Sequence, residues 1–119
     1  MFKVIVAGGR DFADYDLLKS KLDNFLVDRY KYGLVEIVSG TARGADKLGE
    51  FYAKRSQLAL ALFPADWDLY GKSAGYKRNA QMADYADALV AFWDGKSRGT
   101  MHMINLAKSA GLHVRVVNY

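Results

Sequence analysis

The sequence predicts one α/β domain built on a parallel β-sheet. Five short apolar runs alternate with segments whose apolar residues recur at helical spacing, and no linker, repeat or low-complexity tract divides the 119 residues. Continuous apolar runs are typical of strands that helices cover on both faces, and the length suits a single domain with its own core. The five predicted strands are Phe2–Ala7, Leu34–Val38, Leu58–Phe63, Ala88–Trp93 and His113–Val117.

Four helices are predicted between these strands. The first begins after Asp14, a favoured N-cap residue, and stops at Gly33, while the fourth stops at Gly111. Each helix has an apolar stripe that would face the sheet. The stripes are Tyr15, Leu18, Leu22, Phe25 and Leu26; Ala45, Leu48, Phe51 and Tyr52; Tyr76, Ala80, Met82 and Ala83; and Met103, Ile104 and Ala107.

The connection from Pro64 to Ala74 shows no clear periodicity, so it is expected to be a long loop. Two interpretations stay open. The segment covers a binding site, or it is a surface excursion that Trp67 and Tyr70 pack down.

Composition excludes several classes of protein. Seventeen Lys and Arg against thirteen Asp and Glu give a net charge of +4, which suits an anionic partner without requiring DNA. The absence of cysteine excludes disulfides and thiolate zinc sites, and the separated His102 and His113 do not suggest a metal. No apolar run is long enough for a membrane span, and the first residues suggest a strand rather than a signal peptide. We therefore expect a cytoplasmic protein with no cofactor.

Small and charged residues collect where three predicted strands pass into helices. Because parallel strands place all such junctions at the carboxyl edge of the sheet, these loops are expected to meet there. Glycine allows close backbone approach, helix starts offer free N–H groups, and arginine adds charge, which together suit phosphate. The alternative is that the glycines only make turns and the hydroxyls only cap helices. The predicted binding residues in the loops are Gly8, Gly9, Arg10, Ser39, Gly40, Thr41, Arg43, Gly44, Asp46, Gly95, Ser97, Arg98, Gly99 and Thr100.

Further candidates lie outside these loops. Arg78 and Asn79 begin the third helix near the same edge and could hold a phosphate or a ribose hydroxyl, although such a pair is also typical of a solvated helix face. Trp67 and Trp93 could stack on a base or ribose, although Trp93 ends a strand, which favours a place in the core or in the pocket wall. Neither the dinucleotide-binding G-x-G-x-x-G motif nor the P-loop motif is present.

Six segments in order along the chain resemble the YspA-like branch of the SLOG superfamily. This superfamily joins the Rossmann-like domain of DNA-processing protein A with the LOG phosphoribohydrolases. The resemblance implies a Rossmann-like, three-layer α/β/α domain with strand order 3-2-1-4-5 that binds nucleotides or their derivatives at the carboxyl edge. It also implies a homodimer, since relatives often pair their subunits. The segments are Ala7–Phe12, Val38–Asp46, Phe63–Trp67, Tyr70–Lys72, Ala74–Met82 and Phe92–Thr100.

The resemblance also implies candidate catalytic residues. In LOG enzymes an arginine at the start of the third helix and a glutamate after a Gly-Thr pair release a base from a nucleoside 5′-monophosphate. Arg78 resembles that arginine, whereas Met103 stands at the glutamate position. A thioether cannot activate water as a carboxylate can, so hydrolysis would require Asp11 or Asp94 instead.

Three functions remain open at this point. The leading hypothesis is a module that binds or senses a phosphorylated nucleotide or a small molecule derived from one. The second is an N-glycosidic hydrolase of nucleoside 5′-monophosphates. The third is a module for single-stranded DNA, because Ser39–Asp46 resembles the signature of DNA-processing protein A.

Overall fold

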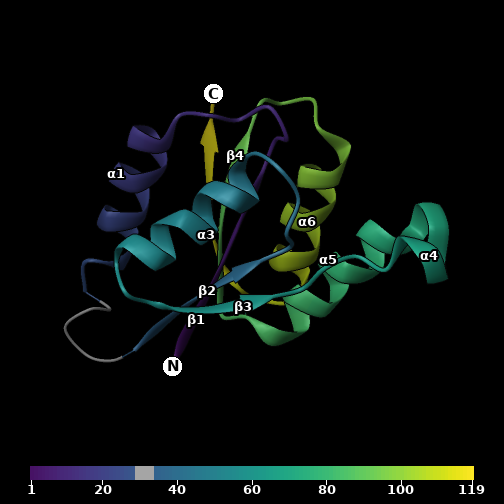
Figure 1. Ribbon diagram of the computed structural model, residues 1–119, viewed down its shortest axis with the longest axis horizontal. Helices are drawn as coiled ribbons and strands as arrows, with labels where there is room; N and C mark the ends of the chain where they lie inside the picture. Colours follow the sequence, from purple (N-terminus) through teal and green to yellow (C-terminus); the bar gives the residue numbers. More distant parts are fainter. Residues whose placement is uncertain (29–33) are drawn as a thin grey trace.

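The computed structural model describes residues 1–28 and 34–119 and contains a five-stranded parallel sheet of order β3-β2-β1-β4-β5. The predicted fold class and strand order are both confirmed. Helices cover the two faces of the sheet (Figure 1). The strands are β1 Phe2–Gly8, β2 Val35–Ser39, β3 Ala59–Leu62, β4 Ala88–Trp93 and β5 His113–Asn118. The helices are α1 Tyr15–Leu26, α3 Ala45–Arg55, α4 Trp67–Tyr70, the 3-10 helix η1 Gly71–Ser73, α5 Ala74–Tyr85 and α6 Arg98–Ser109.

Successive side chains of the central strand β1 point to opposite faces of the sheet, and the core therefore has two layers. Val4 and Val6 of β1 face a cluster that includes side chains of α1 and α3. Ile5 and Ala7 face a second cluster, which α5 and α6 complete. Both faces of β1 are therefore buried, which explains why this strand is apolar throughout.

Helix starts follow the expected capping chemistry. The Asp14 carboxylate accepts a hydrogen bond of 3.0 Å from the amide of Leu17, so its predicted N-cap role is confirmed. The predicted stop at Gly33 lies outside the described residues. Because every strand points the same way, the starts of α3 and α6 lie at the carboxyl edge, close to the loop after β1.

The structure corrects the stripe predicted for the third helix. Tyr76 and Ala80 are exposed, and the buried face instead carries Ala74, Asn79, Met82 and Ala83. The buried face of α5 therefore includes the polar side chain of Asn79, which a search for apolar residues at helical spacing cannot find. In α3, Phe51 is also exposed, and its ring lies edge-on to Tyr15 with centroids 5.0 Å apart.

The segment from Pro64 to Ala74 is largely helical rather than an open loop. The Asp66 carboxylate accepts from the amide of Leu69 at 3.1 Å and caps α4, which passes directly into η1 and α5. A four-residue helix is too short to produce a recognisable apolar period. No side chain of α4 is buried, and Figure 1 shows this helix at one end of the molecule, away from the sheet.

Candidate functional site

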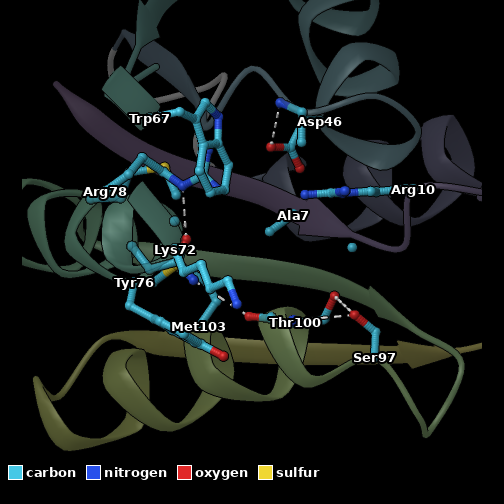
Figure 2. A pocket seen from close by; sticks show the side chains of 16 residues that line it. Ala7, Arg10, Asp46, Trp67, Lys72, Tyr76, Arg78, Ser97, Thr100 and Met103 are labelled. Carbon is cyan, nitrogen blue, oxygen red and sulfur yellow. Dashed lines mark hydrogen bonds between the residues drawn. The ribbon is translucent and has the colours of Figure 1, made fainter. Parts of the chain in front are cut away.

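A cavity of about 220 Å³ opens at the carboxyl edge of the sheet (Figure 2). Its floor comes from the ends of β1 and the inner faces of α5 and α6, and its walls come from the loops after β1 and β2 and from α4. The lining residues are Ala7, Gly8, Arg10, Ala42, Asp46, Trp67, Lys72, Gly75, Tyr76, Arg78, Asn79, Met82, Ser97, Gly99, Thr100 and Met103.

A second cavity adjoins the first. It shares Arg10, Ala42, Trp67 and Arg78 with the first cavity, and extends along the loop after β2. Its other lining residues are Gly40, Thr41, Arg43 and Ala65. We refer to the two cavities together as the edge groove.

Arg78 stands at the junction of the two cavities. Its Nη1 group donates to the carbonyl oxygen of Gly40, and its Nε group donates to Oδ1 of Asn79 at 3.0 Å. The remaining amino group, Nη2, makes no hydrogen bond within residues 1–28 and 34–119. Burial lowers the pKa of Arg78, and the positive charge of Arg10 lowers it further, while Asp46 opposes both effects. The two guanidinium groups are therefore close enough to repel each other.

Gly40 is required for this placement of Arg78. A Cβ atom at position 40 would lie 2.7 Å from Nη1 of Arg78 and 2.9 Å from Oδ2 of Asp46. Any larger residue would therefore separate the guanidinium from the loop backbone.

Asp46 is the buried carboxylate of the groove, with 5% of its surface exposed. Its Oδ2 atom accepts from the amide of Ala42 at 3.2 Å. Burial raises the pKa of Asp46 to about 6, although the Ala42 amide and the charge of Arg78 counteract part of this rise. A carboxyl group that lines the cavity therefore has a pKa well above its ordinary value.

The loop after β2 satisfies several of its own amides. The amide of Thr41 donates to Oγ of Ser39 at 3.0 Å, and the amide of Ala42 donates to the carboxylate of Asp46. Ser39 in turn donates to the buried carboxylate of Glu50 at 2.7 Å. These two amides are therefore not available to a phosphate, and this loop contributes side chains rather than a backbone cradle.

Thr41 has a φ of +66°, a conformation that β-branched residues rarely adopt. Such backbone strain costs on the order of 1–3 kcal/mol and is concentrated at functional sites. Here the strained residue lines the second cavity, and the bond to Ser39 holds it in place.

The start of α6 does present free amides. The carboxylate of Asp94 accepts from the amides of Lys96 and Ser97 at 2.8 and 2.9 Å, which lowers the pKa of Asp94. Ser97 caps the helix by accepting from the amide of Thr100 at 3.4 Å. The amides of Arg98 and Gly99 have no intrahelical partner, and no hydrogen bond from the described part of the chain occupies them.

The structure brings many of the sequence-predicted residues together. Those that line the edge groove are Gly8, Arg10, Gly40, Thr41, Arg43, Asp46, Trp67, Arg78, Asn79, Ser97, Gly99 and Thr100. Those that line neither cavity are Gly9, Asp11, Ser39, Gly44, Trp93, Asp94, Gly95 and Arg98.

Several of the residues outside the groove have structural roles that explain their position. The indole Nε1 of Trp93 donates to the carbonyl oxygen of Ser97 at 3.1 Å and thereby fixes the loop before α6. A Cβ atom at Gly44, which has a φ of +80°, would collide with the carbonyl oxygen of Gly9, so Gly44 allows the first two loops to pack together. A Cβ atom at Gly9 would instead collide with the hydroxyl oxygen of Tyr119. Asp11 and Arg98 are exposed.

Sequence reasoning did not single out every lining residue as a binding residue. Lys72 contributes a cation from η1, and Tyr76 forms part of the rim. Met82 and Met103 supply apolar surface, and both are almost completely buried. Lys72 and Tyr76 lie in the segments that carry the family resemblance, which was the available signal for them.

Residues 2–70 match the model of the YspA, cpYpsA-related SLOG family. The chain belongs to this SLOG family. The match extends from β1 through α4 and so includes the first two loops of the groove. This SLOG domain is 37% identical over 120 residues to the Gene 61 protein of Mycobacterium phage D29, covering 96% of the chain and 94% of the relative. No solved structure matches the SLOG domain.

Two further findings bear on partners. Within residues 1–28 and 34–119, no cluster of three or more histidine or acidic side chains is arranged to hold a metal ion. In the same residues, no helix combines the length and apolar character needed to cross a membrane.

Proposed function

We propose that the edge groove binds a phosphorylated nucleotide or a small molecule derived from one. The observation that carries this proposal is the approach of Arg10 and Arg78 to each other at the junction of the two cavities. Two neighbouring cations, one of them half-buried, repel each other, and the carboxylate of Asp46 can balance only one of the two charges, so an anionic ligand beside them is favoured. Membership of the SLOG family agrees with a nucleotide-related role.

The charges of the groove support an anionic ligand. Four cationic side chains line it, against the single carboxylate of Asp46 among the lining residues. Arginine offers the planar donor pair that matches phosphate oxygens, and Nη2 of Arg78 is free to donate. The cationic side chains are those of Arg10, Arg43, Lys72 and Arg78.

The distribution of polar groups gives the ligand an orientation. The free amide of Gly99 and the positive end of α6 favour the phosphate at that side of the first cavity. Asp46 can accept a hydrogen bond from a hydroxyl or N–H group. Met82, Met103 and Trp67 provide apolar surface for a sugar ring or a base.

Binding is favoured over hydrolysis by the groups that line the groove. Met103 is buried in the wall at the position where LOG enzymes carry a glutamate, and neither Asp11 nor Asp94 lines the groove. A hydrolytic role would therefore depend on Arg78 and on Asp46, which was not expected to act in catalysis.

Thermal unfolding in the presence of AMP, ADP, ribose 5-phosphate and unphosphorylated adenosine tests the proposal. At a concentration about 100 times its dissociation constant, a binding compound should add about 2.7 kcal/mol to the free energy of unfolding. We expect stabilisation by at least one phosphorylated compound and none by adenosine. The absence of stabilisation by every phosphorylated compound would contradict the proposal.

Matched arginine variants locate the binding site. Arg78→Ala should abolish the stabilisation, because Nη2 and the charge at the cavity junction are lost. Arg98→Ala removes the same charge from an exposed position that lines neither cavity, so it should retain the stabilisation. Equal losses in the two variants would indicate non-specific attraction by net charge.

A further inference from the structure

A chain of hydrogen bonds links α6 through α5 to the loop after β2. Nδ1 of His102 lies 3.1 Å from Nδ2 of Asn79, whose Oδ1 accepts from Nε of Arg78. Arg78 then donates through Nη1 to Gly40. Asn79 is buried, with 7% of its surface exposed, so its amide has few alternative partners.

The donor and acceptor roles along these hydrogen bonds follow from the groups at the two ends. Nε of Arg78 can only donate and the carbonyl oxygen of Gly99 can only accept. Asn79 must therefore turn Oδ1 to Arg78 and Nδ2 to Gly99, from which it is 3.4 Å distant, and to His102. Since Nδ2 carries only donor hydrogens, Nδ1 of His102 must be without a proton, and the ring must carry its proton on Nε2.

We propose that Asn79 and neutral His102 are positioning residues that hold the guanidinium of Arg78 in its ligand-binding orientation, and that protonation of His102 releases it. A proton on Nδ1 would place two donors 3.1 Å apart. The side-chain amide of Asn79 could then no longer donate to His102 while it accepts from Arg78. The role of Arg78 toward the ligand rests on the proposed function, whereas the proton position on His102 does not.

The surroundings of His102 favour the neutral ring. Tyr76 of α5 lies edge-on to the imidazole of His102, with ring centroids 4.5 Å apart. Burial lowers the pKa of His102, and no charged group contributes to that shift. The charged side chain that the hydrogen bonds reach is that of Arg78, through Asn79.

Nitrogen NMR of the imidazole rings tests the positioning role directly. The chain has two histidines, so the exposed His113 is an internal reference for His102. At neutral pH we expect His102 to show an unprotonated Nδ1 and a protonated Nε2, and its pKa to lie below the ordinary value for histidine. A protonated Nδ1, or a charged ring at neutral pH, would overturn the proposal.

The variant Asn79→Asp tests the same hydrogen bond by removing its donor. The carboxylate can still accept from Arg78 but can no longer donate to His102. We expect Nδ1 of His102 to become protonated in this variant. An unchanged proton position would contradict a direct interaction between the two side chains. If the variant does not fold, the wild-type spectrum still decides the proposal.

Binding of AMP to the wild type and to His102→Gln between about pH 5 and about pH 8 tests the consequence for Arg78. Glutamine offers an acceptor that does not titrate in this range, and the ratio of the two dissociation constants cancels the titration of AMP and of Asp46. At about pH 8 we expect the two proteins to bind AMP with similar dissociation constants. At about pH 5 we expect the wild type to bind AMP about tenfold more weakly than His102→Gln. A flat ratio would overturn release by protonation. If AMP binds neither protein at any pH, the same ratio is measured with whichever phosphorylated compound stabilises the wild type. If none of them does, the proposed function is wrong, and the NMR measurement still decides the proton position on His102.

Discussion

Replacing Asp46 by asparagine removes a charge that the folded protein holds almost out of contact with water. Asparagine keeps an oxygen that can accept from the amide of Ala42, and it changes the volume of the side chain very little. The pKa of Asp46 is raised from 3.8 to about 6, which corresponds to a cost of about 3 kcal/mol for the ionised group in the folded state.

This cost depends on pH in a defined direction. Between about pH 4 and about pH 6 the folded protein holds a proton that the unfolded chain has released, so stability falls as the pH rises. Above this window the full cost is present, and below it the cost disappears. We therefore expect Asp46→Asn to gain between about 2 and 3 kcal/mol relative to the wild type when the pH is raised from about 4 to about 7.5.

Urea unfolding at the two pH values, followed by circular dichroism, measures this difference. Asp94→Asn is the control, because hydrogen bonds from the amides of Ser97 and Lys96 lower the pKa of Asp94, whereas the pKa of Asp46 is raised. The stabilisation by its carboxylate is already present above the unfolded-state pKa and is lost only as the pH falls through the lowered folded-state pKa, so this control should show no gain relative to the wild type between the two pH values. If Asp46→Asn shows the same stability difference at both pH values, the burial argument for Asp46 is refuted.

Three further substitutions, the last with a matched control, test the groove and the core. Gly40→Ala should weaken AMP binding at least tenfold by calorimetry, because the new Cβ would lie 2.7 Å from Nη1 of Arg78; unchanged affinity would show that the guanidinium need not lie there. A Cβ added at Gly99 would meet nothing within 4 Å, so Gly99→Ala should raise the midpoint of thermal unfolding slightly through helix propensity. It should weaken AMP binding, because the added methyl group would stand beside the free amide that the phosphate approaches; unchanged binding would place the phosphate elsewhere. Leu22→Ala should cost roughly 2–5 kcal/mol in urea unfolding, whereas the exposed Leu69→Ala should cost less than about 0.5 kcal/mol, and equal costs would contradict the assigned core.

The sequence was sufficient to predict that the three loops meet. Their meeting follows from the parallel sheet alone, since each loop follows a strand and all strands end at one edge. Arg10 and Arg43 accordingly line one cavity, although they belong to different loops.

The sequence could not predict which residues of each loop face the groove. At the start of α6, successive residues point about 100° apart, so Gly99 and Thr100 line the cavity while Arg98 is exposed. That difference depends on where the helix begins, which the cap at Ser97 and the turn around Asp94 determine. Asn79 was recognised as a polar residue near the edge, but its partner His102 comes from another helix and has no sequence signal.

The two sides of the edge groove differ in how firmly the protein holds them. The floor rests on buried strand ends, whereas Trp67 is carried by α4, a four-residue helix with no buried side chain. Segments with few buried contacts open locally at low cost, while core strands open only when the whole domain unfolds. Displacement of α4 would therefore widen the entrance without disturbing the sheet. The rate at which a molecule enters and leaves this domain should accordingly depend on the helix that carries Trp67, and its affinity on the residues beneath.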